Sequence, residues 1–175
     1  KGLGDRIEEV VVDPYGDDPL LVEANPIVQV PTLIAEDGRP VTDSPLICDW
    51  LDEIGAGPRL CPPSGTGRLQ VKRLETLGNA ALEMGVKLVL EKRRPETERS
   101  PSWTARWTGN MARALDAIEA ALPDAAAGDD IDIGRITAAA AASWIGFRHP
   151  EFDWAAGRPR LAALRAAMEA RPSFV

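Results

Sequence analysis

The pattern of hydrophobic and polar residues divides the chain into two parts. Up to residue 54, short runs rich in β-branched residues alternate with turn residues and short helical patterns. After a stretch dense in glycine and proline, residues 55–67, every segment repeats its apolar residues at helical spacing. We therefore expect an α/β domain over residues 1–54, a linker over 55–67, and an all-α helical bundle over 68–175.

The first part contains a strand–turn–strand pattern. Residues 29–34 form a β-rich run with one proline, which must lie at a strand start, an edge or a special turn because it cannot donate to a sheet ladder. Asp37-Gly38 is typical of a hairpin turn, and Pro40–Thr42 follows as the returning strand. A further strand is expected over Ile7–Asp13, and one or two helical turns over Leu20–Ala24.

A helix start follows the hairpin. Ser44 suits the N-cap and Pro45 the first helical position of an apolar-faced helix. Helix N-termini attract anions through their unpaired N–H groups, whereas the carboxylate of Asp43 attracts an ammonium group. An anion site beside a carboxylate suits an α-amino acid zwitterion. The alternative is that Asp43 and Ser44 form an ordinary helix cap.

The second part predicts four helices, over residues 68–94, from Ser100-Pro101 to 122, over 133–147 and over 159–171. The small residues Ala138–Ser143 indicate that the third of these is the central buried helix, with Asp132 as its N-cap. Apolar residues at spacings of three and four on the second helix predict a core stripe, made of Trp103, Trp107, Met111, Ala114, Leu115, Ile118 and Leu122.

Composition narrows the classes of function. A formal net charge of -7 argues against nucleic-acid binding, which requires clustered Lys and Arg. No apolar run of the length needed to span a membrane occurs, and a single histidine, His149, cannot build a metal site. Cys48, expected in the core, and Cys61, expected to be half-exposed, lack CxxC spacing. Two such thiols fit a reducing compartment, so we expect a cytoplasmic protein.

Three features in order resemble the glutathione-site signature of the glutathione S-transferase family: the run from Asn25 to Pro31, the Asp37-Gly38 hairpin, and the Asp43-Ser44 pair before a helix. The resemblance implies a thioredoxin-like N-terminal domain, here partial, followed by an all-α helical-bundle C-terminal domain. It also implies glutathione as co-substrate and no metal.

By this resemblance, particular residues would bind particular parts of glutathione. The Val30–Pro31 bond would be cis, and Val30 would pair its N–H and C=O with the cysteinyl unit. Asp43 and Ser44 would hold the γ-glutamyl end. Gln29 would reach polar groups of the tripeptide; the family often has glycine and lysine where this chain has Val28 and Gln29.

The family carries its catalytic serine, cysteine or tyrosine in a strand and helix that precede the part of the fold matched by Lys1. We therefore expect the catalytic residue in that preceding segment and nominate none in this sequence. The implied reaction is attack by the glutathione thiolate on a hydrophobic electrophilic small molecule, a detoxification chemistry. The resemblance also implies a homodimer formed through the helix that starts at Ser44 and the helix over 68–94.

Two alternatives stay open. One is a non-catalytic binding or interaction module with the same fold. The other is a glutathione-dependent thiol–disulfide oxidoreductase or isomerase. It would need a reactive cysteine at the start of the helix expected before Lys1, or a reactive Cys48 or Cys61. Away from this region, we interpret Arg93 and Arg94 as charges that complement a helix dipole, with recognition of an acidic substrate as the alternative. His149 is expected to be a loop histidine without a site.

Overall fold

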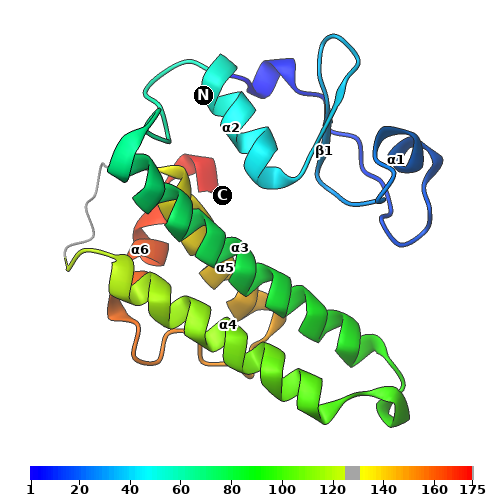
Figure 1. The fold of residues 1–175 in the computed structure, drawn as a ribbon, viewed down its shortest axis with the longest axis vertical. Helices are drawn as coiled ribbons and strands as arrows, with labels where there is room; N and C mark the ends of the chain where they lie inside the picture. The colour runs from blue at the N-terminus through cyan, green and yellow to red at the C-terminus, as the bar shows by residue number, and fades with distance from the viewer. Residues whose placement is uncertain (125–130, 175) are drawn as a thin grey trace. The chain divides into compact units, whose positions relative to one another are not determined.

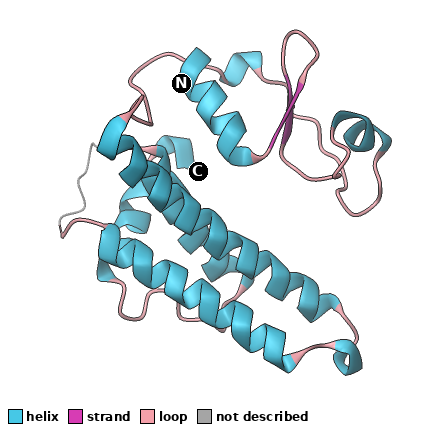
Figure 2. Ribbon diagram, viewed as in Figure 1, coloured by secondary structure: helices cyan, strands magenta, loops and turns pink. Residues whose placement is uncertain are grey.

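The computed structural model describes residues 1–124 and 131–174, and the chain forms two compact units, Lys1–Cys61 and Pro62–Val175. Figure 1 traces the chain through both units, and Figure 2 shows that strands occur in the first. The architecture is an α/β unit followed by an all-helical unit, as the hydrophobic pattern predicts. No described helix is both long enough and apolar enough to span a membrane.

The first unit is built on a two-stranded antiparallel sheet, β1 (Thr32–Ile34) and β2 (Pro40–Thr42). The register pairs Thr32 with Thr42 and Ile34 with Pro40. Gly38, at φ 82°, supplies the left-handed backbone of the predicted turn. The helices of this unit are η1 (Gly4–Arg6), α1 (Pro19–Ala24) and α2 (Ser44–Ile54).

The predicted strand at residues 7–13 is wrong, because this segment is irregular in the structure. A strand exists only through ladder hydrogen bonds to a neighbour, and the described sheet pairs β1 with β2 alone. Without a partner, several β-branched side chains of the segment are exposed, Val10 at 61% and Val11 at 97%. Local β propensity is a poor guide when the partner strand is not specified.

Asp52 organises the turn that ends the first unit. It is buried, and its two carboxylate oxygens accept the N–H groups of Leu60 at 2.9 Å and Cys61 at 3.3 Å. The Nζ of Lys1 lies 2.9 Å from Oδ1 of Asp52. These bonds draw the predicted linker onto α2, so Cys61 is 5% exposed rather than half-exposed.

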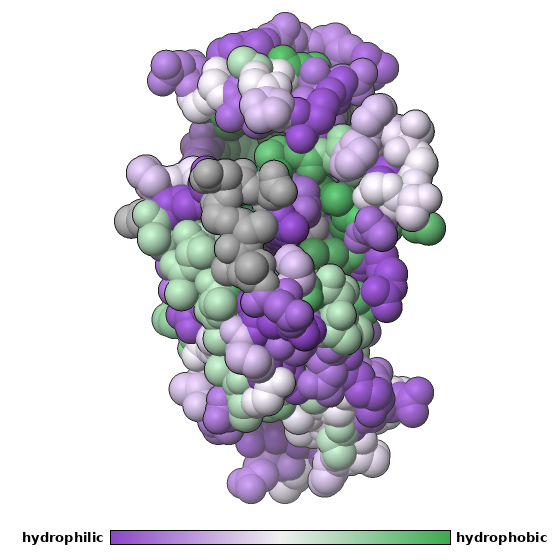
Figure 3. Space-filling model, turned by 90° about the vertical axis from the view of Figure 1, so that its left-hand side faces the viewer, coloured by the Kyte–Doolittle hydropathy of each residue, from purple (hydrophilic) through white to green (hydrophobic). Residues whose placement is uncertain are grey.

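The second unit contains α3 (Gly65–Arg93), η2 (Glu96–Glu98), α4 (Pro101–Ala121), α5 (Ile133–Arg148), α6 (Pro159–Glu169) and η3 (Pro172–Phe174). Helix α3 packs against both α4 and α5, and α6 packs against α5. The core is one continuous cluster that includes Leu88, Met111, Leu115, Ile118, Ala142, Ile145 and Leu161. Hydrophilic residues cover much of the face shown in Figure 3.

Side-chain caps begin α4 and α5 where the sequence predicts them. The Ser100 hydroxyl accepts the N–H of Trp103 at 3.4 Å, and Oδ1 of Asp132 accepts the N–H of Arg135 at 2.8 Å. The predicted core stripe of α4 is confirmed except at its first residue. Trp103 is 52% exposed and stacks on Trp107 with ring centroids 5.6 Å apart.

Helices α3 and α5 approach each other closely at two glycines. A Cβ atom on Gly78 would lie 2.8 Å from the Thr137 side chain, and one on Gly85 would lie 2.6 Å from the Trp144 ring. The glycines are seven residues apart on α3, and their two contact residues are seven apart on α5. The small-residue prediction for α5 is confirmed, since Ala138, Ala139, Ala141 and Ala142 are fully buried.

His149, expected to be a loop histidine, is the C-cap residue that directly follows α5, and it is buried, with 1% of its surface exposed. Its Nε2 lies 3.0 Å from the carbonyl oxygen of Gly85, and because a carbonyl only accepts, Nε2 carries the hydrogen. Nδ1 then accepts from the Lys92 ammonium group at 3.1 Å, and Lys92 also pairs with Glu151. The histidine therefore joins α5 to α3.

Candidate functional site

The candidate site lies at one end of the β1–β2 sheet. Because Thr32 pairs with Thr42, the residues before β1 and after β2 are brought together at this end. The structure thus places the Gln29–Pro31 segment beside Asp43 and Ser44. Ser44 is half-buried and the other four are exposed, which leaves the five residues accessible to a ligand.

Val30 lies outside the sheet ladder, which starts at Thr32. The Val30–Pro31 peptide bond is cis, as the resemblance implies. The backbone N–H and C=O of a residue outside a ladder can pair with an extended peptide, in the manner of an added strand.

Val28 has a left-handed backbone, with φ 51°. A β-branched residue rarely adopts this conformation, which costs about 1–2 kcal/mol relative to ordinary backbone. Its N–H donates to the carbonyl oxygen of Asn25 at 2.9 Å, which holds the turn. The conformation explains in physical terms why glycine suits this position.

Asn25 is the buried centre of the loop, with 2% of its surface exposed. Its Nδ2 donates to the carbonyl oxygen of Gln29 at 2.9 Å and to Oγ1 of Thr32 at 3.1 Å. Its Oδ1 accepts the N–H of Ile27 at 3.2 Å. Asn25 begins the motif from Asn25 to Pro31, but the sequence predicts no role for its side chain; the available signal is a polar residue within a run of apolar and proline residues.

Helix α2 starts one residue earlier than the sequence suggests. Asp43, not Ser44, is the N-cap residue, since its carbonyl oxygen accepts the N–H of Ile47 at 3.0 Å. Asp43 has φ 74°, and its side chain makes no cap hydrogen bond. An ordinary Asp cap would direct the carboxylate to the helix N–H groups. Here the carboxylate is instead exposed beside the positive end of the helix dipole.

This arrangement combines three recognition elements. The N-terminus of α2 offers N–H groups to an anion, and the Asp43 carboxylate offers an acceptor to an ammonium group. The segment before β1 offers peptide groups to a third, extended part of a ligand. Together they fit a peptide that begins with a free α-amino acid group.

Other candidate groups lie elsewhere. A pocket of about 330 Å³ in the first unit is lined by Leu33, Trp50 and Ile54 among others, and none of the five site residues lines it. Neither Cys48 nor Cys61 is in a disulfide. Among residues 1–124 and 131–174, no group of three or more His, Cys, Asp or Glu side chains is arranged to hold a metal ion.

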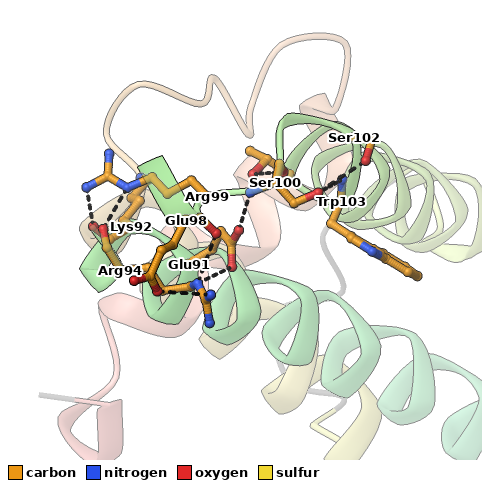
Figure 4. A network of polar contacts seen from close by, with 9 residues as sticks. Glu91, Lys92, Arg94, Glu98, Arg99, Ser100, Ser102 and Trp103 are labelled. Atoms are coloured by element: carbon orange, nitrogen blue, oxygen red, sulfur yellow. Dashed lines mark hydrogen bonds and ion pairs between the residues drawn. The ribbon is translucent and has the colours of Figure 1, made fainter. Parts of the chain in front are cut away.

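Arg94 belongs to a network of polar contacts at the α3–α4 corner, shown in Figure 4. Its Nη2 lies 3.3 Å from Oε2 of Glu98, and its Nε lies 3.8 Å from Oε2 of Glu91. Glu91 also accepts the N–H of Ser100 at 2.6 Å, and Arg99 donates to the carbonyl oxygen of Lys92 at 2.8 Å. These contacts favour the structural interpretation of this basic segment.

Comparison with known proteins identifies relatives across the chain. Residues 1–54 match the profile described as "Glutathione S-transferase, N-terminal domain", and residues 101–167 match "Glutathione S-transferase, C-terminal domain". The GST-like protein YibF of Escherichia coli, described as uncharacterized, is 29% identical over 162 residues, which is 92% of this chain and 80% of that protein.

Solved structures are similar over nearly the whole chain. A glutathione S-transferase of Methylobacterium radiotolerans, in complex with glutathione sulfonate, is 33% identical with a TM-score of 0.85, covering 93% of this chain and 78% of that one. A glutathione transferase family member of Pseudomonas fluorescens, with bound glutathione, is 29% identical with a TM-score of 0.89, covering 99% and 85% of the two chains.

Proposed function

The chain belongs to the glutathione S-transferase family, and from this we propose that it binds glutathione at the end of the β1–β2 sheet and transfers the glutathione thiolate to an electrophilic small molecule. Its fold is that of the family: a small thioredoxin-like N-terminal part with two strands, followed by an all-helical C-terminal domain. Relatives with this fold bind glutathione or glutathione sulfonate.

Each part of glutathione has a proposed partner. The α-carboxylate of the γ-glutamyl unit binds the N–H groups and hydroxyl at Ser44, and its ammonium group binds the Asp43 carboxylate. The cysteinyl unit pairs with the backbone of Val30, next to Pro31. Gln29 donates or accepts hydrogen bonds along the tripeptide backbone, without the charge of a lysine.

The observation that carries this proposal is the geometry of Asp43. Its left-handed φ of 74° and the absence of a side-chain cap bond leave the carboxylate free of the role that an Asp before a helix usually has. A charged side chain held in an uncommon backbone conformation at a helix start is a pattern found at ligand sites more than in ordinary caps.

The chemistry requires the glutathione thiol to ionise. A free thiol of this kind has a pKa of about 8.5, and lowering it by about two units requires roughly 2.7 kcal/mol of preferential thiolate stabilisation. A hydroxyl or thiol donor near a helix N-terminus supplies this in principle. We assign the donor to none of the residues 1–175.

The proposal is tested by thermal unfolding of the protein with and without reduced glutathione. A ligand present at about a hundredfold its Kd stabilises the native state by about 2.7 kcal/mol. Asp43→Asn is the sharpest variant, because asparagine tolerates the left-handed backbone and removes only the charge. We expect it to weaken glutathione binding by about tenfold to a hundredfold, the range for a lost hydrogen bond to a charged group.

Asp5→Ala is the matched control, since it removes one exposed carboxylate from the same unit without touching the site. It should leave the glutathione shift unchanged. A wild-type protein that shows no shift at millimolar glutathione would contradict the proposal. Conjugation of an aryl halide electrophile then separates the enzyme from a non-catalytic binding module, which would show the shift and no turnover.

We also infer a homodimer that uses α2 and α3. Each of these helices exposes a large apolar side chain, Leu46 on α2 and Leu69 on α3, and such residues are common in the contacts of stable dimers. Light scattering during gel filtration tests this directly. A mass of 18.8 kDa would identify a monomer and contradict the inference.

A further inference from the structure

Asn25 is the C-cap residue of α1, but this position does not explain why its side chain is buried. Its backbone N–H already serves as the cap by donating to the carbonyl oxygen of Leu21 at 2.7 Å. The side chain is not needed there, yet it is almost fully buried and makes hydrogen bonds with three residues, Ile27, Gln29 and Thr32. Buried amide groups must be paired, and this one is paired with the loop that precedes β1 and with the first residue of β1.

Asn25, Gln29 and Thr32 form a closed triangle of hydrogen bonds, which we term the Asn25 clamp. The carbonyl oxygen of Gln29 accepts from Nδ2 of Asn25 at 2.9 Å and from Oγ1 of Thr32 at 2.8 Å. Nδ2 of Asn25 also donates to Oγ1 of Thr32 at 3.1 Å. Two donors that converge on one carbonyl oxygen fix its direction.

That direction determines where the N–H of Val30 points. The carbonyl of Gln29 and the N–H of Val30 belong to one peptide unit, which is planar. The bond is trans, because the cis bond of this segment is the next one, between Val30 and Pro31. In a trans unit the C=O and N–H point in opposite directions. With its carbonyl held toward the buried amide of Asn25, the unit directs the N–H of Val30 away from the protein interior.

We propose that Asn25 and Thr32 are positioning residues for glutathione: by holding the Gln29 carbonyl, they aim the N–H of Val30 at the cysteinyl unit. This inference rests on the proposed function and adds residues that do not touch the ligand. Preorganisation of a single donor matters because a loop outside the sheet ladder would otherwise lose conformational freedom on binding.

The test uses S-methylglutathione, whose blocked thiol makes its affinity independent of thiol ionisation, measured by calorimetry on the full chain. Thr32→Val replaces the hydroxyl by a methyl group of similar size and removes two sides of the triangle. We expect its Kd to rise about fivefold to tenfold, as for the loss of one or two hydrogen bonds. Thr32→Ser keeps the hydroxyl and should bind like the wild type.

Thr42→Val is the matched control, because Thr42 pairs with Thr32 across the sheet and receives the same substitution. It should leave the Kd unchanged. Asn25→Ala removes the two sides contributed by the amide and its further hydrogen bond with Ile27, and it should weaken binding more than Thr32→Val. That variant risks misfolding because it empties a buried polar site, so the inference depends on the Thr32 series.

Hydrogen exchange at single amides separates positioning from general stability. In the wild type, S-methylglutathione should protect the amides of Val30 and of Ser44 and Leu46 at the start of α2. In Thr32→Val, protection should fall at Val30 and persist at the two α2 amides. A merely structural role would lower protection at all three together.

The outcomes distinguish this inference from the function on which it rests. If the wild type binds S-methylglutathione and Thr32→Val binds equally well, the clamp is overturned and the glutathione site stands. If the wild type does not bind, both are overturned. Weaker binding with selective loss of protection at Val30 supports both.

Discussion

The two units of the molecule are each stabilised by a different kind of interaction. In the first, the described buried apolar residues are Leu3, Leu21, Ile47 and Cys61, and the buried polar residues Asn25 and Asp52 each fix a turn by several hydrogen bonds. In the second, an apolar cluster runs continuously along four helices. The proposed site lies in the unit with the smaller core. Its geometry therefore depends on directed hydrogen bonds, whereas the second unit depends on packing.

The two units also differ in charge. Residues 1–61 contain four Lys and Arg against thirteen Asp and Glu, whereas residues 62–175 contain sixteen against fourteen. Glutathione, with two carboxylates and one ammonium group, is itself negative at neutral pH. The proposed site must therefore attract an anion by local N–H groups against the repulsion of its own unit.

The largest effect is expected in the packed unit. Leu115 is fully buried on α4, and Leu115→Ala should lower the free energy of unfolding by about 2–5 kcal/mol through the lost apolar contacts and the cavity left behind. Denaturant unfolding monitored by hydrogen exchange in each unit measures it. Leu20→Ala, an exposed leucine on α1, is the control and should change stability by less than about 0.5 kcal/mol. Equal losses of unfolding free energy in Leu115→Ala and Leu20→Ala would contradict the conclusion that the second unit depends on packing.

A polar substitution should have the next largest effect, in the first unit. Burial raises the pKa of Asp52, but the N–H of Leu60, the Lys1 ammonium and the N–H of Cys61 lower it further, so the pKa lies below its ordinary value of 3.8. Asp52→Asn should reduce stability by about 1–3 kcal/mol at neutral pH. Asparagine has a single side-chain oxygen, so one of the N–H groups of Leu60 and Cys61 loses its acceptor.

The contribution of Asp52 to stability should decrease as the pH falls. A carboxyl whose pKa is lower in the folded state stabilises the protein above its unfolded pKa, here 3.8, and loses that contribution as the pH falls through the folded pKa. The stability difference between the wild type and Asp52→Asn should therefore be constant above pH 3.8 and shrink below it. A difference that does not change with pH would show that shape, not charge, matters at this turn.

Val28→Gly should stabilise the first unit. Removing the Cβ relieves about 1–2 kcal/mol of left-handed strain, and the greater freedom of glycine in the unfolded chain offsets about 0.5–1 kcal/mol of this. The net gain of up to about 1.5 kcal/mol is measurable by thermal unfolding. Glutathione affinity should not fall, because the Asn25 clamp is left intact. A loss of stability would mean that packing of the valine side chain outweighs its backbone strain.

The smallest effect concerns salt. Raising the ionic strength from about 0.01 M to 0.15 M shortens the screening length from about 30 Å to 8 Å, which suppresses the repulsion between the acidic unit and an anionic ligand more than contacts within the site. We expect the affinity for glutathione to rise by about twofold. In Glu8→Gln combined with Glu9→Gln, which removes two exposed charges, this salt effect should be smaller. An affinity that falls with salt would show that local ion pairing dominates.

Features encoded by adjacent residues were predictable from the sequence. The Ser100 and Asp132 caps and the Asp37-Gly38 turn depend on side chains within three residues of the backbone groups they serve. The candidate glutathione-binding segments were identified in the same way, from local motifs. These segments lie at the same end of the sheet because the hairpin sets the register that pairs Thr32 with Thr42.

Features that depend on distant partners were not predictable. The burial of His149 depends on its partners Lys92 and Gly85, which are 57 and 64 positions away. Residues 7–13 have the composition of a strand without a described partner, and Cys61 is buried because of a carboxylate nine residues earlier. The side-chain role of Asn25 depends on a loop conformation in which Val28 has a left-handed backbone. A β-branched residue disfavours that conformation, so the sequence does not predict it.

The two glycine contacts between α3 and α5 restrict how the helical unit can vary in length. Gly78 and Gly85 meet partners that are also seven residues apart, so the two helices share a repeat of two turns. Inserting or deleting fewer than seven residues between these glycines would rotate one of them away from its partner or move it along the helix by about one turn, and would place a larger side chain against Thr137 or Trp144. Descendants of this sequence should therefore change length in the connections between helices, while the segment from residue 78 to 85 keeps its length.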